Sequence, residues 1–332
     1  MVLREMQKYK VAYFAVLPWW TCDIVCHDCL FSSGPNTSGK LEFATLAAAI
    51  SEAVACCDLR TVSMSGGEPF LYPEYVYRLA AHVISLGCTF RVVTNANFAT
   101  SLDVAIGVLA PLKKLGAESI YVSWDRFHSQ FVPAERIRHA IQACRTLGLN
   151  LRLTVVTTRS NTIDTSLCEL GDDAFDVPIS QSKCLPIGRA VKKIEASEFL
   201  APSKLDKGRA CAHDFDTIAM TYDGSLYPCC AVGGFTDALK LGRYPELSLG
   251  DLLKRRSGET KWQILQYQGP TYLRRHASRT EATLLGLSDQ DHDCVTCNKI
   301  FSSPIGETLV GRANAFIKTS VQAILRNADV ER

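Results

Sequence analysis

The sequence predicts an α/β fold: a partial (β/α)6 barrel of the TIM type followed by a small cysteine-rich C-terminal domain. Apolar, strand-like segments alternate with helical segments six times over about 180 residues, which is typical of a parallel sheet with crossover helices. Chemically notable residues fall just after predicted strands, where parallel sheets carry their reactive groups. Six units are too few for a closed eight-stranded barrel, so we expect a barrel that is open on one side.

The predicted strands are short apolar runs rich in Val, Ile, Tyr and Phe. They cover residues 10–17, 60–64, 89–94, 119–123, 151–157 and 177–182. Apolar residues at helical spacing predict helices at residues 43–56, 75–86, 102–115, 134–147 and 162–170. Pro111 is expected to kink or split the third helix, and Gly148 is expected to end the fourth.

The alternation stops near residue 191, and the residues up to 207 are predicted to form a charged linker. Two strand-like segments, 217–221 and 225–227, then flank an Asp-Gly pair that is typical of hairpin turns. Further helices are predicted at residues 247–256, 261–267 and 316–327. We therefore predict three parts, with bounds at residues 1–205 for the barrel, 206–300 for the second domain and 301–332 for a helical segment.

The composition argues against several classes of function. The chain has 332 residues, 47% of them hydrophobic, and a formal net charge of +2, so neither a nucleic acid nor a membrane is expected as a partner. The N-terminal residues lack a signal-peptide pattern, and no apolar stretch approaches the ~20 residues of a membrane span. We expect a cytoplasmic protein, in which clusters among the fourteen cysteines indicate metal binding or catalysis rather than disulfides.

Three cysteines directly follow the first predicted strand: Cys22, Cys26 and Cys29, in a C-x3-C-x2-C arrangement. Three thiolates this close converge on one point, and a four-iron, four-sulfur cluster takes four ligands. One iron is then left for an external ligand, whereas a purely structural metal site is normally closed. After the second strand comes Gly66-Gly67-Glu68-Pro69, whose glycines allow a close approach of backbone to a ligand.

These two motifs resemble those of the radical S-adenosylmethionine (radical SAM) superfamily, whose members use a (β/α)6 partial barrel. The resemblance implies a first [4Fe–4S] cluster on the three cysteines, with the methionine end of SAM at the glycine loop and its ribose near the fourth strand. The SAM-binding residues implied are Gly66, Gly67, Glu68, Pro69, Ser123 and Asp125. The chain departs from the superfamily at Asp28, where the residue before the third cysteine is usually aromatic and packs on adenine. Phe31 or another residue would have to take over that role.

A second set of cysteines resembles the twitch domain, a shortened relative of the SPASM domain of radical SAM enzymes. The matching residues flank the predicted hairpin and form a distant C-x2-C: Cys211, Cys229, Cys294 and Cys297. Four thiolates would fully ligate a second [4Fe–4S] cluster. A four-cysteine zinc site is the alternative that the same ligands allow.

The resemblance implies that SAM is cleaved reductively to a 5′-deoxyadenosyl radical, with an electron from a flavodoxin- or ferredoxin-type donor, and that this radical abstracts a substrate hydrogen atom. Cys230, next to Cys229 and surplus to the second ligand set, resembles the hydrogen-atom donor of radical SAM peptide epimerases. Epimerisation of a residue in a ribosomally made peptide or related natural product is therefore the leading hypothesis. Cys184 is a second candidate donor, and His128 is either a base, a substrate contact or a structural residue.

Other hypotheses remain open. A twitch-type dehydrogenase of an aminocyclitol or sugar, or a peptide cross-linking enzyme, would carry the same parts. With only about twenty residues before Cys22, a fused peptide-binding domain is not expected. A metal-binding structural or redox-sensing protein is the non-enzymatic alternative, although it gives no reason for the glycine loop after the second strand.

Overall fold

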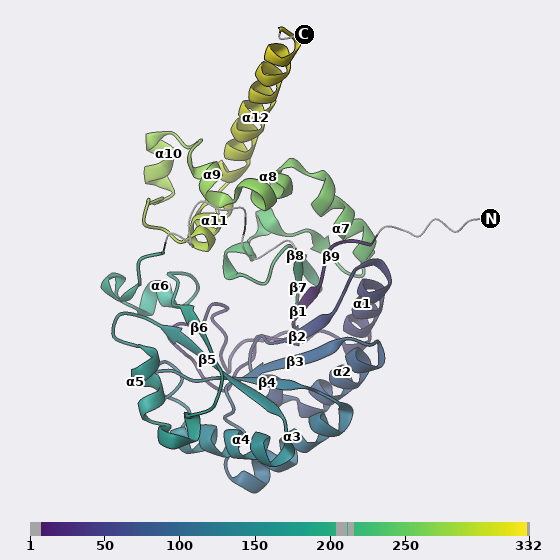
Figure 1. Cartoon of the computed structure of the whole chain (residues 1–332), viewed down its shortest axis with the longest axis vertical. Helices are drawn as coiled ribbons and strands as arrows, with labels where there is room; N and C mark the ends of the chain where they lie inside the picture. Colours follow the sequence, from purple (N-terminus) through teal and green to yellow (C-terminus); the bar gives the residue numbers. More distant parts are fainter. Residues whose placement is uncertain (1–7, 204–210, 212–215, 331–332) are drawn as a thin grey trace, which may run out of the picture. The chain divides into compact units, whose positions relative to one another are not determined.

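A computed structural model describes residues 8–203, 211 and 216–330 of the chain. The chain forms two compact units (Figure 1). The first comprises Met1–Leu200, Asp216–Leu226 and Gly242–Gly250, and the second comprises Ala201–Phe215, Tyr227–Leu241 and Asp251–Arg332. The predicted bounds of the three parts differ from this division and stay a prediction.

The first unit is built on a nine-stranded sheet with the order β6-β5-β4-β3-β2-β1-β7-β8-β9. The strands are β1 (Tyr13–Leu17), β2 (Thr61–Met64), β3 (Thr89–Thr94), β4 (Ser119–Ser123), β5 (Asn150–Thr157), β6 (Ile179–Lys183), β7 (Thr217–Thr221), β8 (Ser225–Tyr227) and β9 (Gly242–Arg243). Strands β1 to β6 pair in parallel with their sequence neighbours. Because β6 and β9 end the order, the sheet does not close, and the prediction of a partial barrel is confirmed.

Five helices connect the parallel strands and lie along one face of the sheet (Figure 1). They are α1 (Phe43–Cys56), α2 (Pro73–Ser85), α3 (Leu102–Leu115), α4 (Ala134–Leu147) and α5 (Ile163–Cys168). Strand side chains such as Phe14, Val62 and Ile120 are fully or almost fully buried, as are Leu46 and Leu79 on the helices. Each buried side chain of this size contributes about 1.5–3 kcal/mol, so the core holds the strand ends in fixed positions.

Most of the predicted barrel elements match to within three residues, but the structure corrects two details. Pro111 does not split the third helix, which runs as one element from Leu102 to Leu115, and the alternative that Pro111 kinks this helix stays a prediction. The predicted linker contains two short helical segments, α6 (Ala190–Lys193) and a 3₁₀ turn (Ala196–Glu198), and its part at 204–207 lies outside the described residues.

The hairpin segments take a position that the sequence did not predict. Strand β7 adds in parallel to β1, with Tyr13 opposite Thr217, and so extends the barrel sheet beyond its first strand. Its residues Ile218, Ala219 and Met220 are all fully buried. A strand that is buried on both faces needs a place inside a sheet, which explains why β7 pairs with β1 rather than only with β8.

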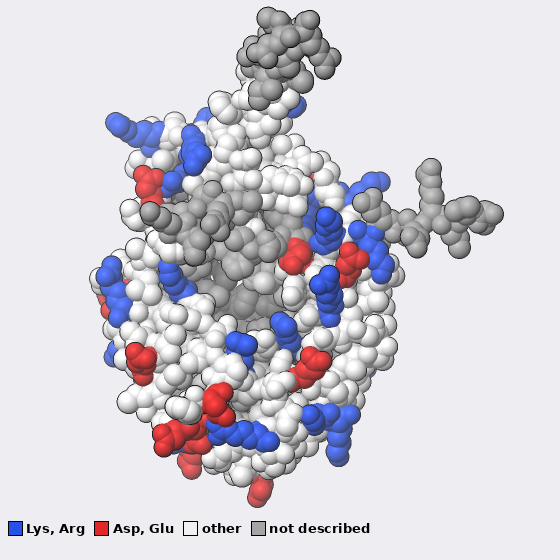
Figure 2. All heavy atoms as spheres, in the orientation of Figure 1, with Lys and Arg blue, Asp and Glu red and all other residues white. Residues whose placement is uncertain are grey.

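The remaining helices are α7 (Leu249–Gly258), α8 (Thr260–Gln268), α9 (Pro270–Arg274), α10 (Arg279–Leu284), α11 (Asp293–Phe301) and α12 (Ile305–Val330). Three of them, α9 to α11, were not predicted, and α12 starts eleven residues before the predicted 316. None of the described helices is both long and apolar enough to cross a membrane. Figure 2 shows basic and acidic side chains interspersed over the face it displays, in keeping with the near-neutral net charge.

Candidate functional site

A cavity of about 120 Å³ lies in the first unit, where strands β1 to β4 end. The predicted site residues that line it are Cys22, Cys26, Cys29, Gly66, Gly67, Glu68 and Ser123. Pro69 and Asp125 are not among the lining residues. The structure thus gathers the first cysteine set, the glycine loop and one of the two residues after β4 around one space.

The two glycines hold the chain that leads into the cysteine loop (residues 22–30). Gly67 N–H donates to Trp19 O at 2.9 Å, and Glu68 N–H donates to Thr21 O at 2.9 Å. A Cβ on Gly67 would lie 1.8 Å from Thr21 O, and Gly66 has a φ of +119°. Gly67 has no room for a side chain and Gly66 has a backbone conformation that other residues rarely adopt. The two glycines therefore hold the cysteine loop against the end of β2 and also line the cavity.

Glu68 ties the glycine loop to the end of β3. One carboxylate oxygen, Oε1, accepts from Phe70 N at 2.9 Å and from Thr94 Oγ1 at 2.6 Å, and Oε2 accepts from Asn95 N at 2.8 Å. Burial raises the pKa of Glu68 to about 7, although these hydrogen bonds oppose the shift. Pro69 is buried and begins a 3₁₀ turn that leads to α2.

A hydrogen-bond network after β3, which was not predicted from the sequence, supports the first cysteine. Asn95 Nδ2 donates to Asp23 Oδ1 at 2.8 Å and lies 3.8 Å from Cys22 Sγ. Asn97 Nδ2 donates to the other oxygen of Asp23 at 2.6 Å. Since both amides bind the residue next to Cys22, they restrict the position of that thiol.

The loop after β6 also makes hydrogen bonds to the cysteine loop. Arg189 donates through Nη1 to Cys26 O at 2.6 Å, through its backbone N–H to Cys29 O at 3.0 Å, and through Nη2 to Ser33 O. A Cβ on Gly188, whose φ is +64°, would lie 2.4 Å from Leu30 O. This loop is far from the cysteines in sequence, and only the folded structure brings it to them.

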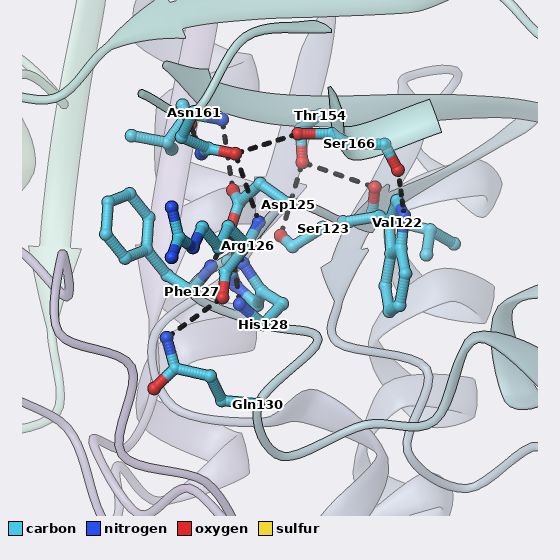
Figure 3. Close-up of polar contacts among 12 residues, drawn as sticks. Val122, Ser123, Asp125, Arg126, Phe127, His128, Gln130, Thr154, Asn161 and Ser166 are labelled. Atoms are coloured by element: carbon cyan, nitrogen blue, oxygen red, sulfur yellow. Dashed lines mark hydrogen bonds and ion pairs between the residues drawn. The ribbon is translucent and has the colours of Figure 1, made fainter. Parts of the chain in front are cut away.

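The two residues predicted to bind ribose have different environments (Figure 3). Ser123 lines the cavity and accepts from Thr154 Oγ1 at 3.2 Å. Asp125 is 1% exposed: its Oδ1 accepts from Phe127 N at 2.9 Å and its Oδ2 accepts from Val156 N at 3.0 Å. Asp125 therefore shapes the turn after β4, and its carboxylate oxygens are occupied within the protein.

His128 links Asp125 to the cysteine loop. Its Nδ1 lies 2.8 Å from Asp125 Oδ1, and its ring lies within hydrogen-bonding reach of Cys26. Burial disfavours a charged imidazole, but Asp125 and Cys26 outweigh it and hold the pKa of His128 well above its usual value. His128, Cys26 and Asp28 place ligand atoms within 4.8 Å of one another.

The thiols of the first set fit a metal centre. Burial raises the pKa of Cys22 to about 12 and also raises the pKa of Cys26. Such thiols stay protonated at neutral pH unless a cation stabilises the thiolate form. Asp28 Oδ1 and Ser33 Oγ, which line the same cavity, are buried without a hydrogen-bond partner among the described residues. The site is therefore suited to a metal cluster together with a polar ligand.

The second cysteine set belongs to the second unit. Cys294 and Cys297 lie one turn apart on α11, and Cys229 follows β8. The pKa of Cys297 is raised well above its usual value by burial and by the charges of Cys229, Cys294 and Cys211, so the four sulfurs are electrostatic neighbours.

Two glycines that the sequence reasoning missed pack the second set together. A Cβ on Gly234 would lie 2.5 Å from Cys229 Sγ, and one on Gly233 would lie 2.2 Å from Cys294 O. Cys230 is exposed. Cys184, the other candidate donor, is 3% exposed in the first unit, and burial raises its pKa to about 12.

Phe31 does not line the cavity but stacks with Trp20, with 6.0 Å between the ring centroids. The aromatic replacement for Asp28 that the sequence suggested is thus engaged with another side chain.

No family model matches the chain. A search of curated proteins finds the "putative peptide biosynthesis protein YydG" of Bacillus subtilis (strain 168), 22% identical over 224 residues that cover 66% of this chain and 69% of the relative. Among solved structures, SuiB of Streptococcus suis bound to S-adenosylmethionine aligns with a TM-score of 0.45 and 15% identity, covering 83% of this chain and 77% of SuiB. Methylornithine synthase (PylB) aligns with a TM-score of 0.42 and 13% identity, covering 57% and 58%. The chain is similar to radical SAM proteins, as its two motifs indicate.

Proposed function

We infer that this chain is a radical SAM enzyme that modifies a peptide. The observation that carries this inference is the single cavity that joins Cys22, Cys26 and Cys29 to the glycine loop and to Ser123. A structural or redox-sensing metal site would not need a glycine loop and a polar strand end around the same space. The similarity to a peptide biosynthesis protein supports a peptide as the substrate.

Within this site the residues have distinct tasks. The three cysteines would hold the first [4Fe–4S] cluster, and the backbone of Gly66 and Gly67 would face the methionine end of SAM. Ser123 accepts from Thr154, and its own hydroxyl hydrogen would be donated to a ribose. When bound, the cluster and SAM would supply the radical chemistry that removes a substrate hydrogen atom, and these residues would position the reactants and exclude side reactions.

The second cysteine set is proposed to hold a second [4Fe–4S] cluster. In a tetrahedral zinc site with Zn–S bonds of about 2.3 Å, sulfurs lie about 3.8 Å apart. Besides burial, the charges of Cys229, Cys294 and Cys211 each raise the pKa of Cys297, so the four sulfurs lie near one another, and four thiolates would fully ligate such a [4Fe–4S] cluster. Gly233 and Gly234 keep side chains away from Cys294 and Cys229, because a Cβ at either position would collide with one of these cysteines.

For the reaction we propose epimerisation, with Cys230 as the hydrogen-atom donor. A hydrogen atom is removed from the α-carbon of a peptide residue, and the Cys230 S–H returns one to the opposite face. The thiyl radical left on Cys230 then needs one electron and one proton, which a flavodoxin- or ferredoxin-type donor and solvent supply. The exposure of Cys230 supports this role because a thiol that donates to a substrate must be reachable.

The reaction is tested in D2O with a candidate precursor peptide encoded beside the gene. Epimerisation predicts one deuterium at one inverted carbon, because thiols exchange their proton with solvent. Cys230→Ala should abolish that incorporation while still producing 5′-deoxyadenosine. Cys168→Ala, which removes another exposed thiol, is the matched control and should behave as the wild type. A product lighter by two mass units would instead support dehydrogenation or cross-linking.

A further inference from the structure

Strand β6 ends the nine-stranded sheet, and within the described residues only its β5 side pairs with another strand (Figure 1). Leu153 N–H donates to Pro178 O and Cys184 N–H donates to Thr157 O, each at 2.9 Å. In a parallel pair these bonds fix the alternation, so the even-numbered residues of β6 bond to β5 and the odd-numbered ones direct their backbone groups to the outer edge. Gln181, in the middle of the strand, makes no backbone hydrogen bond on that edge with any described residue.

The side chains of β6 are also more exposed than those of the other barrel strands. Ser180, Gln181 and Ser182 are all exposed, whereas no strand from β1 to β5 has more than one exposed residue. None of these three residues is charged or a proline, and charges and prolines are the usual means of blocking an exposed strand edge. An edge of this kind can take up an extended peptide as an additional strand.

A groove of about 510 Å³ follows the carboxyl end of β6. Its apolar lining residues are Pro186, Val191, Ile194 and Phe199. Lys192 and Lys193 also line the groove, are exposed, and make no ion pair with any described residue, while Glu195 is the one acidic residue in the described lining. The groove therefore suits an apolar side chain that is accompanied by carboxylates.

One loop joins this groove to the cavity that holds the first cysteine set. Pro186 lines the groove, and three residues later Arg189 donates to Cys26 O at 2.6 Å. Cys26 lines the cavity. Since β6 runs parallel to the strands whose ends surround the cavity, its carboxyl end lies at the same edge of the sheet.

We propose that the substrate peptide binds as an additional strand on the outer edge of β6, with an apolar side chain in the groove and acidic side chains near Lys192 and Lys193. This proposal rests on the proposed function. Main-chain hydrogen bonds to β6 give affinity for an extended peptide, and the groove and the two lysines select its sequence. The bound segment holds the residue to be modified at the carboxyl end of the barrel, so that its reaction is no longer limited by encounter.

The test measures binding of a fluorescein-labelled synthetic peptide, the product of the short reading frame beside the gene, to anaerobically reconstituted protein with SAM. Gln181→Pro removes the outward N–H, a change that the edge of a sheet tolerates. It should weaken binding by about 2- to 12-fold or more, the range for one hydrogen bond. Gln181→Ala keeps the N–H and is the matched control, which should lose much less affinity than Gln181→Pro.

The charge of the groove is tested separately. Lys192→Gln and Lys193→Gln should each weaken binding by roughly 1.4- to 5-fold, as expected for an exposed ion pair. Lys114→Gln, which removes an exposed lysine of α3, is the control and should leave the affinity unchanged. Iron content and thermal midpoint are measured for every variant, so that a folding defect is recognised.

A second measurement needs only the wild-type protein. A series of peptides, each with one N-methylated amide, is titrated in the same assay. Binding to the edge of β6 predicts a loss at every second amide of the bound segment, because alternate N–H groups of a strand face its neighbour. Losses without this alternation would overturn the proposal even if Gln181→Pro failed to fold.

The remaining outcomes are distinct. If folded, iron-loaded Gln181→Pro binds the peptide as the wild type does, the proposal is wrong. If that variant instead converts a dimer to a monomer without weakening peptide binding, the edge pairs with a second copy of the chain and the peptide assignment is overturned. If the wild type modifies the peptide while every variant binds it equally, only this inference fails. If iron-loaded wild-type protein neither binds the peptide nor cleaves SAM, the proposed function fails as well.

Discussion

Replacing Arg189 with alanine tests whether the loop after β6 holds the cysteine loop in place. The guanidinium donates one hydrogen bond to a carbonyl of the cysteine loop, at Cys26, and one to the carbonyl of Ser33, just after the loop. Charge-assisted bonds contribute about 1.5–3 kcal/mol each, which sets an upper limit of roughly 6 kcal/mol, and about 2 kcal/mol remains if water replaces most of the interaction. A loss of about 2 kcal/mol corresponds to roughly a 30-fold change in an equilibrium.

We therefore expect Arg189→Ala to release iron from the first site about 30-fold more readily in a competition with an iron chelator. The assay is run in a Cys294→Ser background, so that the first cluster alone is followed. Arg189→Lys should give an intermediate result because it keeps the charge but loses the fork of donors. Arg145→Ala, which removes an exposed arginine paired with Asp176, is the control. Equal iron release by the wild type and Arg189→Ala would refute the reasoning.

Three further predictions concern Gly67, Glu68 and Cys294. Gly67→Ala should destabilise the protein by about 1–3 kcal/mol or more, because the new Cβ would collide with Thr21 O. Gly107→Ala is the control and should be neutral or stabilising, because the space around Gly107 is open. Equal melting temperatures of the two variants would contradict this prediction. Glu68 has a folded pKa raised from 4.5 to about 7, so the stability that its neutral form contributes is present below about pH 4.5 and is lost as the pH rises toward 7. The free energy of unfolding should fall by about 3 kcal/mol over that interval, and chemical denaturation of Glu68→Gln should show a smaller fall. Cys294→Ser should lower the iron content from about eight to about four per chain, and an unchanged content would argue against a second cluster on this set.

The barrel could be predicted from the sequence because each of its elements carries a local signal. Strands such as Thr89–Thr94 and helices such as Ala134–Leu147 have the bounds that apolar periodicity indicated. The cysteine loop and the glycine loop follow adjacent strands, and parallel pairing brings adjacent strand ends to one edge. That rule alone was enough to place Cys22 and Gly66 around one cavity.

The features that were missed depend on contacts between distant parts of the chain. Arg189 is 163 residues from Cys26 in sequence, and no local pattern marks the hydrogen bond between them. Asp125 follows β4 as expected, but its carboxylate is occupied by backbone N–H groups, which a sequence position does not reveal. The short helix α10 was missed because six residues with mostly polar side chains show no apolar period.

The Asp28 oxygen, which has no hydrogen-bond partner among the described residues, is another feature that the sequence alone did not reveal. The sequence marked this position only as a departure from the superfamily pattern. In the structure Asp28 is buried, lines the cavity, and receives no hydrogen bond from Arg189, which donates to carbonyl oxygens instead. Asp28 is therefore a candidate contact for a ligand. Each of these three facts requires the folded chain.

The central claim is that the cavity between the cysteine loop and the glycine loop cleaves SAM reductively. The most direct measurement is 5′-deoxyadenosine formed by anaerobically reconstituted protein with SAM and dithionite, compared with Cys26→Ala. Our account predicts reductant-dependent 5′-deoxyadenosine from the wild type and none from the variant, with the second cysteine set still loaded with iron. Wild-type protein that is fully loaded with iron yet never cleaves SAM, with dithionite or with a flavodoxin as the reductant, would contradict it.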